Sequence, residues 1–95
     1  MANQEKADTH VLSVTSSVNY ADFGSPPLSE VYLYADTATA GLVQVDFDRS
    51  PDLTTSFPLP GKTVVRIRVN CNKVYAIAAS GTTNLYILGV RLNNA

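Results

Sequence analysis

The 95-residue chain has one cysteine and no tryptophan, and only 16% of its residues are charged. A single cysteine excludes an internal disulfide and leaves no CxxC or Cys/His cluster for zinc or redox chemistry. The formal net charge of -1 argues against a protein that coats nucleic acid or an anionic membrane, because such binding needs a large excess of lysine and arginine. We therefore expect no nucleic-acid partner, no membrane partner and no cofactor.

Long hydrophobic runs are also absent. No segment approaches the roughly 18 consecutive apolar residues of a membrane span. The opening residues, MANQEKADT, are polar and mixed in charge, and they lack the basic start and apolar run of a secretory signal peptide. We expect residues 1–9 to form a flexible N-terminal arm, residues 10–95 to form a single domain, and the chain to be made in the cytoplasm and to stay there.

The pattern that is present has a period of two, which is typical of half-buried strands. A first strand is expected from residue 9, with one largely apolar face formed by His10, Leu12, Val14, Val18 and Tyr20. Alternation at 31–35 and again at 42–47 predicts a hairpin over residues 31–47. Further on, inward positions are expected at Val65, Ile67 and Val69, and outward positions at Val64, Arg66 and Arg68.

Proline and glycine divide these strands. Residues 22–29 and 48–61 hold all five prolines, so the second segment is expected to contain only a short edge strand around residues 54–57. Two more strands, KVYAIAAS and NLYILGVRL, are separated by the turn at residues 80–83. The pattern predicts an all-β fold, a small antiparallel β-sandwich or jelly-roll-like barrel of six to eight short strands. Because residues 75–79 and 85–88 are apolar on both faces, we expect a second subunit to cover one face.

Catalytic chemistry finds little support in the sequence. The one histidine, His10, begins a strand, and we interpret it as a packed or surface residue and not as a general base. Cys71 lies in a predicted turn between two asparagines, with no histidine or basic cluster nearby to lower its pKa, so we interpret it as an ordinary turn cysteine. We expect the chain not to be an enzyme.

One acidic stretch imitates part of a calcium loop. Its oxygen-bearing side chains occupy alternate positions, at Asp46, Asp48, Ser50 and Asp52. A calcium loop of the EF-hand type needs glycine at its sixth position and glutamate at its twelfth, and here those positions hold Pro51 and Phe57. Weak calcium binding stays open, and the alternative is that Asp48 or Asp52 accepts hydrogen bonds from backbone amides.

The residue types that do stand out are those of protein interfaces. The chain has five tyrosines and four arginines, which anchor interfaces through large rigid area and bidentate hydrogen bonds. Ordinary sheet composition explains the same counts. Binding to single-stranded nucleic acid is superficially suggested by two arginines and two tyrosines, Arg66, Arg68, Tyr75 and Tyr86. The net charge of the chain argues against this interpretation. Binding of a sugar by exposed tyrosines is a weaker interpretation, because the chain has no tryptophan.

The stretch VVRIRVNCNKVYAIAASGTTNLYILGV, residues 64–90, resembles small virion proteins of tailed bacteriophages. The resemblance covers less than a third of the chain closely and residues 31–47 loosely. It implies a capsid decoration or cement protein with a jelly-roll or related sandwich fold, often trimeric, that binds the major capsid protein on the capsid surface of the virion. The alternative is a tail, fibre or baseplate module that binds a carbohydrate or a receptor.

On this interpretation the contacts to other subunits come from the N-terminal arm, the proline-rich loop, the exposed tyrosines and the arginine-bearing strand. The arm is expected to extend across an adjacent subunit. The candidate interface residues are Asn3, Glu5, Lys6, Tyr32, Tyr34, Phe57, Leu59, Arg66 and Arg68.

Overall fold

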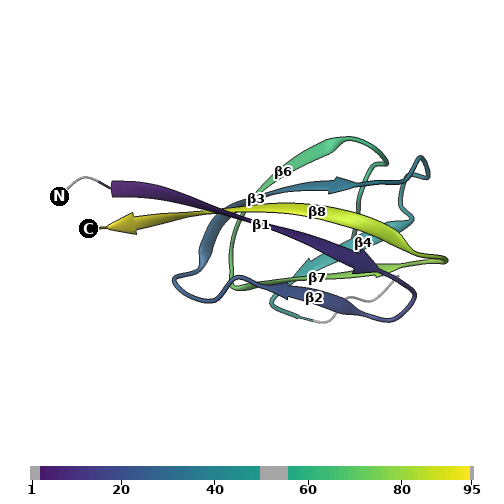
Figure 1. The fold of residues 1–95 in the computed structure, drawn as a ribbon, viewed down its shortest axis with the longest axis horizontal. Helices are drawn as coiled ribbons and strands as arrows, with labels where there is room; N and C mark the ends of the chain where they lie inside the picture. The colour runs from purple at the N-terminus through teal and green to yellow at the C-terminus, as the bar shows by residue number, and fades with distance from the viewer. Residues whose placement is uncertain (1–2, 50–55, 95) are drawn as a thin grey trace.

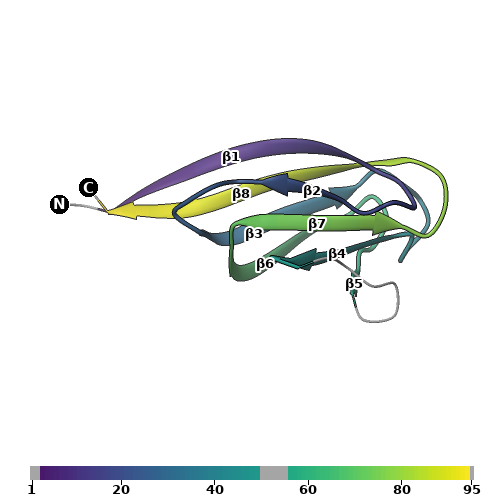
Figure 2. The ribbon, with the colours of Figure 1, turned by 90° about the horizontal axis from the view of Figure 1, so that it is seen from below.

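The structure, a computed structural model, describes residues 3–49 and 56–94, with the backbone alone at 3–6 and 92–94. It contains eight strands in two antiparallel sheets (Figures 1 and 2). The strands are β1 (Asn3–Val14), β2 (Asn19–Asp22), β3 (Leu28–Ala35), β4 (Val43–Phe47), β5 (Phe57–Pro58), β6 (Val64–Cys71), β7 (Lys73–Ala78) and β8 (Thr83–Asn94). The all-β prediction is confirmed, although β1 and β8, at twelve residues each, are not short.

The first sheet, here called sheet A, has the order β1-β8-β3-β6, and the second, sheet B, has the order β2-β7-β4-β5. Successive strands alternate between the sheets except at β4 and β5, which is the order of a jelly roll. Because the chain crosses from one sheet to the other at almost every turn, each sheet presents one face to a shared core and the other face to solvent.

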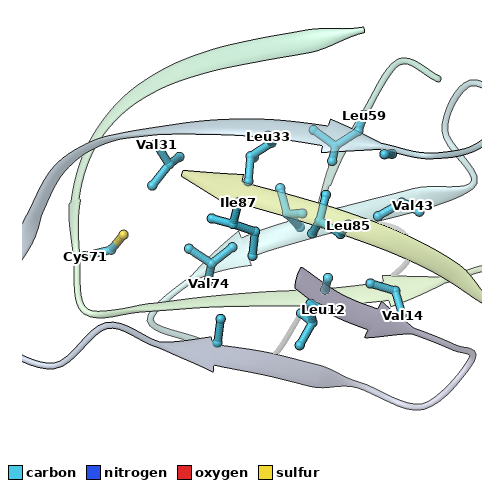
Figure 3. Close-up of a cluster of buried hydrophobic side chains, with 14 of the residues drawn as sticks. Leu12, Val14, Val31, Leu33, Val43, Leu59, Cys71, Val74, Leu85 and Ile87 are labelled. Carbon is cyan, nitrogen blue, oxygen red and sulfur yellow. The ribbon is translucent and has the colours of Figure 1, made fainter. Parts of the chain in front are cut away.

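Alternation along the strands builds that core. Leu33 of β3 and Leu85 of β8 are 1% and 0% exposed, and Figure 3 shows Leu85 among side chains contributed by both sheets. The inward positions predicted for β6 hold, since Val65, Ile67 and Val69 pack against the core while the residues between them are exposed.

The predicted first strand is wrong in its length. Strand β1 ends at Val14, and residues 15–18 carry the chain to sheet B, where β2 begins. This connection bends where the Ser17 amide donates to Thr15 Oγ1 at 3.1 Å. The bend resets the alternation, so Val18 and Tyr20 are 40% and 49% exposed and the buried residue of β2 is Ala21.

The predicted hairpin over residues 31–47 is also wrong. Strand β3 lies in sheet A and β4 in sheet B, so the two strands face each other across the core instead of pairing. Both arrangements bury the same alternate side chains, which is why alternation does not distinguish them. A short edge strand does lie in the proline-rich segment, as β5, which pairs with β4. It overlaps the expected residues 54–57 at Phe57, and residues 54 and 55 lie outside the described residues.

The boundary predicted after residue 9 is not a structural boundary. Strand β1 begins at Asn3, and residues 3–9 pair in register with residues 88–94 of β8. The arm's polar sequence carries no apolar periodicity, yet its backbone pairs with the equally long β8. Its flexibility stays a prediction.

Cys71 ends β6 inside the core and is 1% exposed, so it is not the turn cysteine that the sequence predicts. Burial, with a smaller contribution from the negative charge of Asp48, raises the pKa of its thiol from 9.0 to about 11. The folded protein therefore keeps this proton at pH values where the unfolded chain releases it.

We expect this difference to make stability depend on alkaline pH. The stabilising contribution is complete below about pH 9 and is lost as the pH rises towards about 11, at a cost of at most about 3 kcal/mol. Urea unfolding of the wild type and of Cys71→Ala across this range checks it. The wild-type curve should fall more steeply with pH than that of the variant, and parallel curves contradict the expectation.

Candidate interaction face

The outward face of sheet A gathers apolar and aromatic side chains from all four of its strands. One row crosses the sheet in register, from Val11 of β1 to Tyr86 of β8, Tyr34 of β3 and Val64 of β6. Val11 and Val64 are each 62% exposed and Tyr86 is 42% exposed. The rings of Tyr34 and Tyr86 lie 6.0 Å apart, so the middle of the row is an aromatic pair flanked by two exposed valines.

A second row runs beside the first, from Thr9 to Leu88, Tyr32 and Arg66. Apart from Arg66, the residues of the two rows line a shallow open groove of about 330 Å³ whose walls are almost entirely apolar. We call the outward side chains of these two rows the sheet A face. Apolar surface collected in this way on a small domain is typical of a contact site for another macromolecule.

Charged residues border the sheet A face at one end of β3 and β6. Arg66 Nε donates to Glu30 Oε2 at 2.5 Å, and this carboxylate raises the pKa of the Arg66 guanidinium further above its ordinary value. Arg68 lies opposite Glu30 in the register, and within the described residues no ion pair includes it. Arg66 at the end of its row, with Glu30 and Arg68 beside it, thus places two cations and one anion at this end of the sheet A face, which suits a rim of polar contacts around an apolar centre.

The outward face of sheet B is different. Tyr20 and Tyr75 form a pair with ring centroids 5.2 Å apart, and the Lys73 ammonium lies 5.2 Å from the centroid of the Tyr20 ring. Asp46 lies opposite Tyr75 in the register and binds Arg49 at 2.6 Å. Charged groups therefore sit beside the aromatic pair on this face, whereas the aromatic pair of the sheet A face has valines beside it.

Four of the nine predicted interface residues meet on one surface. Tyr32, Tyr34 and Arg66 belong to the sheet A face, and Arg68 lies at its border. Tyr75 and Tyr86, which the sequence alone allows on adjacent strands, lie in different sheets. The arginine and tyrosine combination that superficially suggested nucleic-acid binding is therefore not formed on one face, because β7 and β8 follow one another in the chain but lie in opposite sheets.

The other predicted interface residues lie elsewhere. Leu59 is 2% exposed in the core, so its side chain is not available for an interface, and this prediction needs correction. Phe57 is 49% exposed but belongs to β5 at the edge of sheet B. Asn3, Glu5 and Lys6 lie in the first half of β1, and their side chains are outside the described part of the chain.

The sheet A face is completed by five residues that sequence reasoning did not select for an interface, namely Thr9, Val11, Val64, Tyr86 and Leu88. A signal for Val11 exists, because it is an apolar residue at a position where its neighbours two residues away, Thr9 and Ser13, are polar. Tyr86 and Leu88 alternate with the buried residues Leu85 and Ile87, so the outward direction of their side chains follows only once β8 is known to have one solvent face.

The acidic stretch is organised by hydrogen bonds within the protein. Asp48 adopts a left-handed backbone conformation with φ of 59°, and its Oδ1 accepts hydrogen bonds from the amides of Asn72 and Lys73, each at 2.9 Å. The interpretation of Asp48 as a cap for backbone amides is confirmed. Ser50 and Asp52 lie outside the described residues, and in the described ranges no three acidic, histidine or cysteine side chains gather in a metal-binding arrangement.

This geometry predicts that Asp48→Ala lowers the free energy of unfolding by about 1 to 3 kcal/mol. Alanine loses both hydrogen bonds to the β6–β7 turn and is strained at positive φ. The matched control is Asp48→Asn, since asparagine keeps a side-chain oxygen acceptor and tolerates this conformation. Urea unfolding checks both variants, and an equal loss of stability in both contradicts the role given to the acceptor and the backbone conformation.

His10 packs at the end of the sandwich. Its ring lies 4.5 Å from that of Phe23 in an edge arrangement, so this exposed residue packs against an aromatic ring on one side. Nearby, Arg91 Nη2 donates to the Phe23 carbonyl at 2.6 Å and lies 3.5 Å from Asp8 Oδ2. These contacts join β1 and β8 to Phe23, which follows β2.

No family model, curated protein or solved structure matches this chain significantly. Within the described residues, no helix fits the length and apolar character of a membrane span.

Proposed function

We propose that the chain is a structural protein of a tailed-bacteriophage virion, which decorates the head shell and stabilises it by binding the major capsid protein through the sheet A face. The observation that carries a contact role is the row from Val11 to Val64, in which exposed apolar and aromatic side chains cross all four strands. The resemblance of residues 64–90 to small virion proteins supports the choice of the shell as the partner.

The stabilisation follows from mass action. A protein that binds the assembled shell and not its separated subunits shifts the equilibrium towards the shell. If each copy touches more than one capsid subunit, modest contacts combine and the apparent affinity rises without a strong single site. The sheet A face suits such a role, because its apolar centre supplies most of the contact energy and its charged border orients the contact.

The proposal is tested on purified particles of the phage that encodes the chain. Quantitative mass spectrometry should find the protein in the head fraction, in a copy number comparable to that of the major capsid protein. Heads assembled without it should break at a lower temperature and regain their stability when the purified protein is added back. Absence from the particle, or a few copies confined to the tail, contradicts the proposal, and the second result favours a tail or receptor-binding module.

A further inference from the structure

Strand β1 is an edge strand that is neither short, nor bulged, nor interrupted by proline, and the charges in its sequence, at Glu5, Lys6 and Asp8, are of both signs. Among the described residues it pairs with β8 alone, over twelve residues, without a register shift and without a proline. Natural edge strands are usually short, bulged, charged or interrupted by proline, because their free amides and carbonyls otherwise pair with another chain.

The other three edges have such protection. Strand β2 has only four residues, and β5 has two residues of which one is Pro58. Strand β6 carries Arg66 and Arg68, and its pairing with β3 shifts register between Leu28 and Glu30. Strand β1 differs from these three edges in its length and its unbroken register, and its charges of both signs allow attraction to a copy of the same strand.

One third of this edge, residues 3–6, extends beyond the part of β8 that pairs with β3. Strand β3 pairs with β8 only as far as Val90, whereas the β1–β8 ladder continues to the pair Asn3 and Asn94. The two strands thus leave the sandwich as a two-stranded ribbon, and Figures 1 and 2 show both chain ends at its tip. With this ribbon the molecule is 47 Å long but only 23 and 19 Å across. Two-stranded ribbons are marginally stable in water and gain stability from further strands.

We propose that the β1 edge binds a second copy of this chain, with the two β1 strands antiparallel around a two-fold axis at Ala7. The pairing of a strand with its own copy is self-complementary and closes with two molecules. It makes one continuous sheet of eight strands from the two copies of sheet A. The ribbon leaves room for this arrangement, since the two sandwich bodies lie at opposite ends of the paired strands.

The charges of β1 select the register. In a continuous antiparallel sheet, residues that lie opposite each other point to the same face of the sheet. The two-fold axis between two identical strands therefore passes between the two copies of one residue. Centred on Ala7, the register places Lys6 opposite Asp8 twice. A register centred one residue earlier would place the two copies of Lys6 opposite each other, and a register centred one residue later would do the same for Asp8. Like charges directly opposite each other destabilise a pair of strands.

This inference is independent of the proposed function, because it uses the edge of sheet A and requires no capsid. It also differs from the trimer that the resemblance implies, since antiparallel pairing of identical edges closes with two copies. Each molecule of the pair keeps its own sheet A face exposed on the same side of the continuous sheet.

A cysteine cross-link tests the register directly. With the axis at Ala7, the two residues at position 7 have Cα atoms about 4.5 to 5.5 Å apart, which permits a disulfide. The matched control is Thr9→Cys, whose two copies lie four residues apart along the strands, about 13 Å, which is too far. Ala7 and Thr9 are both exposed, and the native Cys71 is buried and does not compete.

Under mild oxidation Ala7→Cys should become a covalent dimer while Thr9→Cys stays a monomer. Native mass measurement should find the wild type as a dimer, and Lys6→Asp should raise its dissociation constant at least about tenfold. The double variant Lys6→Asp with Asp8→Lys should restore the affinity, and Arg68→Asp, on the opposite edge, should leave it unchanged. A chain that is monomeric at about 1 mM or trimeric, an Ala7→Cys variant that does not cross-link, or equal cross-linking of both cysteine variants overturns the proposal.

Discussion

Replacing Leu85 with alanine is expected to lower the free energy of unfolding by about 2 to 5 kcal/mol. Leu85 is 0% exposed in the middle strand pair of sheet A, and Figure 3 shows it surrounded by side chains from both sheets. Removing it leaves a cavity that the two sheets are unable to close without disturbing the ladders on either side of β8. In a domain of this size, such a loss is a large share of the total stability.

The control for this prediction is the next residue in the same strand. Tyr86 points to the opposite side of the sheet and is 42% exposed, so Tyr86→Ala is expected to cost about 1 kcal/mol or less. Urea unfolding monitored by circular dichroism compares the two variants. Equal losses would show that β8 does not separate a core side from a solvent side.

The second large effect is expected in binding. If the sheet A face holds the chain on the head shell, Tyr86→Ala should weaken that attachment at least about 30-fold, because aromatic residues at the centre of an interface typically contribute about 2 kcal/mol or more. Tyr86 lies between Val11 and Tyr34 in the row that crosses the sheet, so its removal opens the middle of the contact.

A matched tyrosine on the other sheet controls this prediction. Tyr20 is 49% exposed and also forms an aromatic pair, but it lies on the outward face of sheet B. Tyr20→Ala should leave attachment to purified heads unchanged when both variants are measured by co-sedimentation over a range of protein concentrations. If Tyr20→Ala weakens attachment and Tyr86→Ala does not, the contact lies on sheet B and the assignment of the face is wrong.

The alternation of apolar residues was sufficient to predict the fold class and the inward residues of several strands. It predicts Val31, Leu33 and Ala35 as one side of a strand, and all three are buried in β3. The same signal did not reveal which strands pair. The hairpin expected over residues 31–47 and the crossover that exists both bury the same side chains, and the difference lies in contacts between residues far apart in the chain.

The candidate site was predictable only in part, for a related reason. Arg66 and the neighbouring tyrosines are recognisable as interface residue types from the sequence alone. Their meeting on one surface depends on β8 inserting between β1 and β3, which places Tyr86 beside Tyr34. Leu59 was selected for an interface but lies in the core. The sequence does not separate these two places, because an apolar residue in a proline-rich loop is compatible with either.

The jelly-roll arrangement by itself does not decide the function, because this fold carries many unrelated activities. What the structure adds to the proposal is a division between the two faces. Sheet A offers an apolar centre with a charged border, and sheet B offers an aromatic pair among charged groups. A protein that attaches to a shell needs one side for the contact and one side for solvent.

The measurement that tests this division most directly is a reconstruction of phage heads with the purified chain bound. We predict density on the outer surface of the shell, with Tyr34 and Tyr86 turned towards the capsid protein and Tyr20 turned towards solvent. Heads that carry no such density, or copies that expose the sheet A face to solvent, would contradict the account.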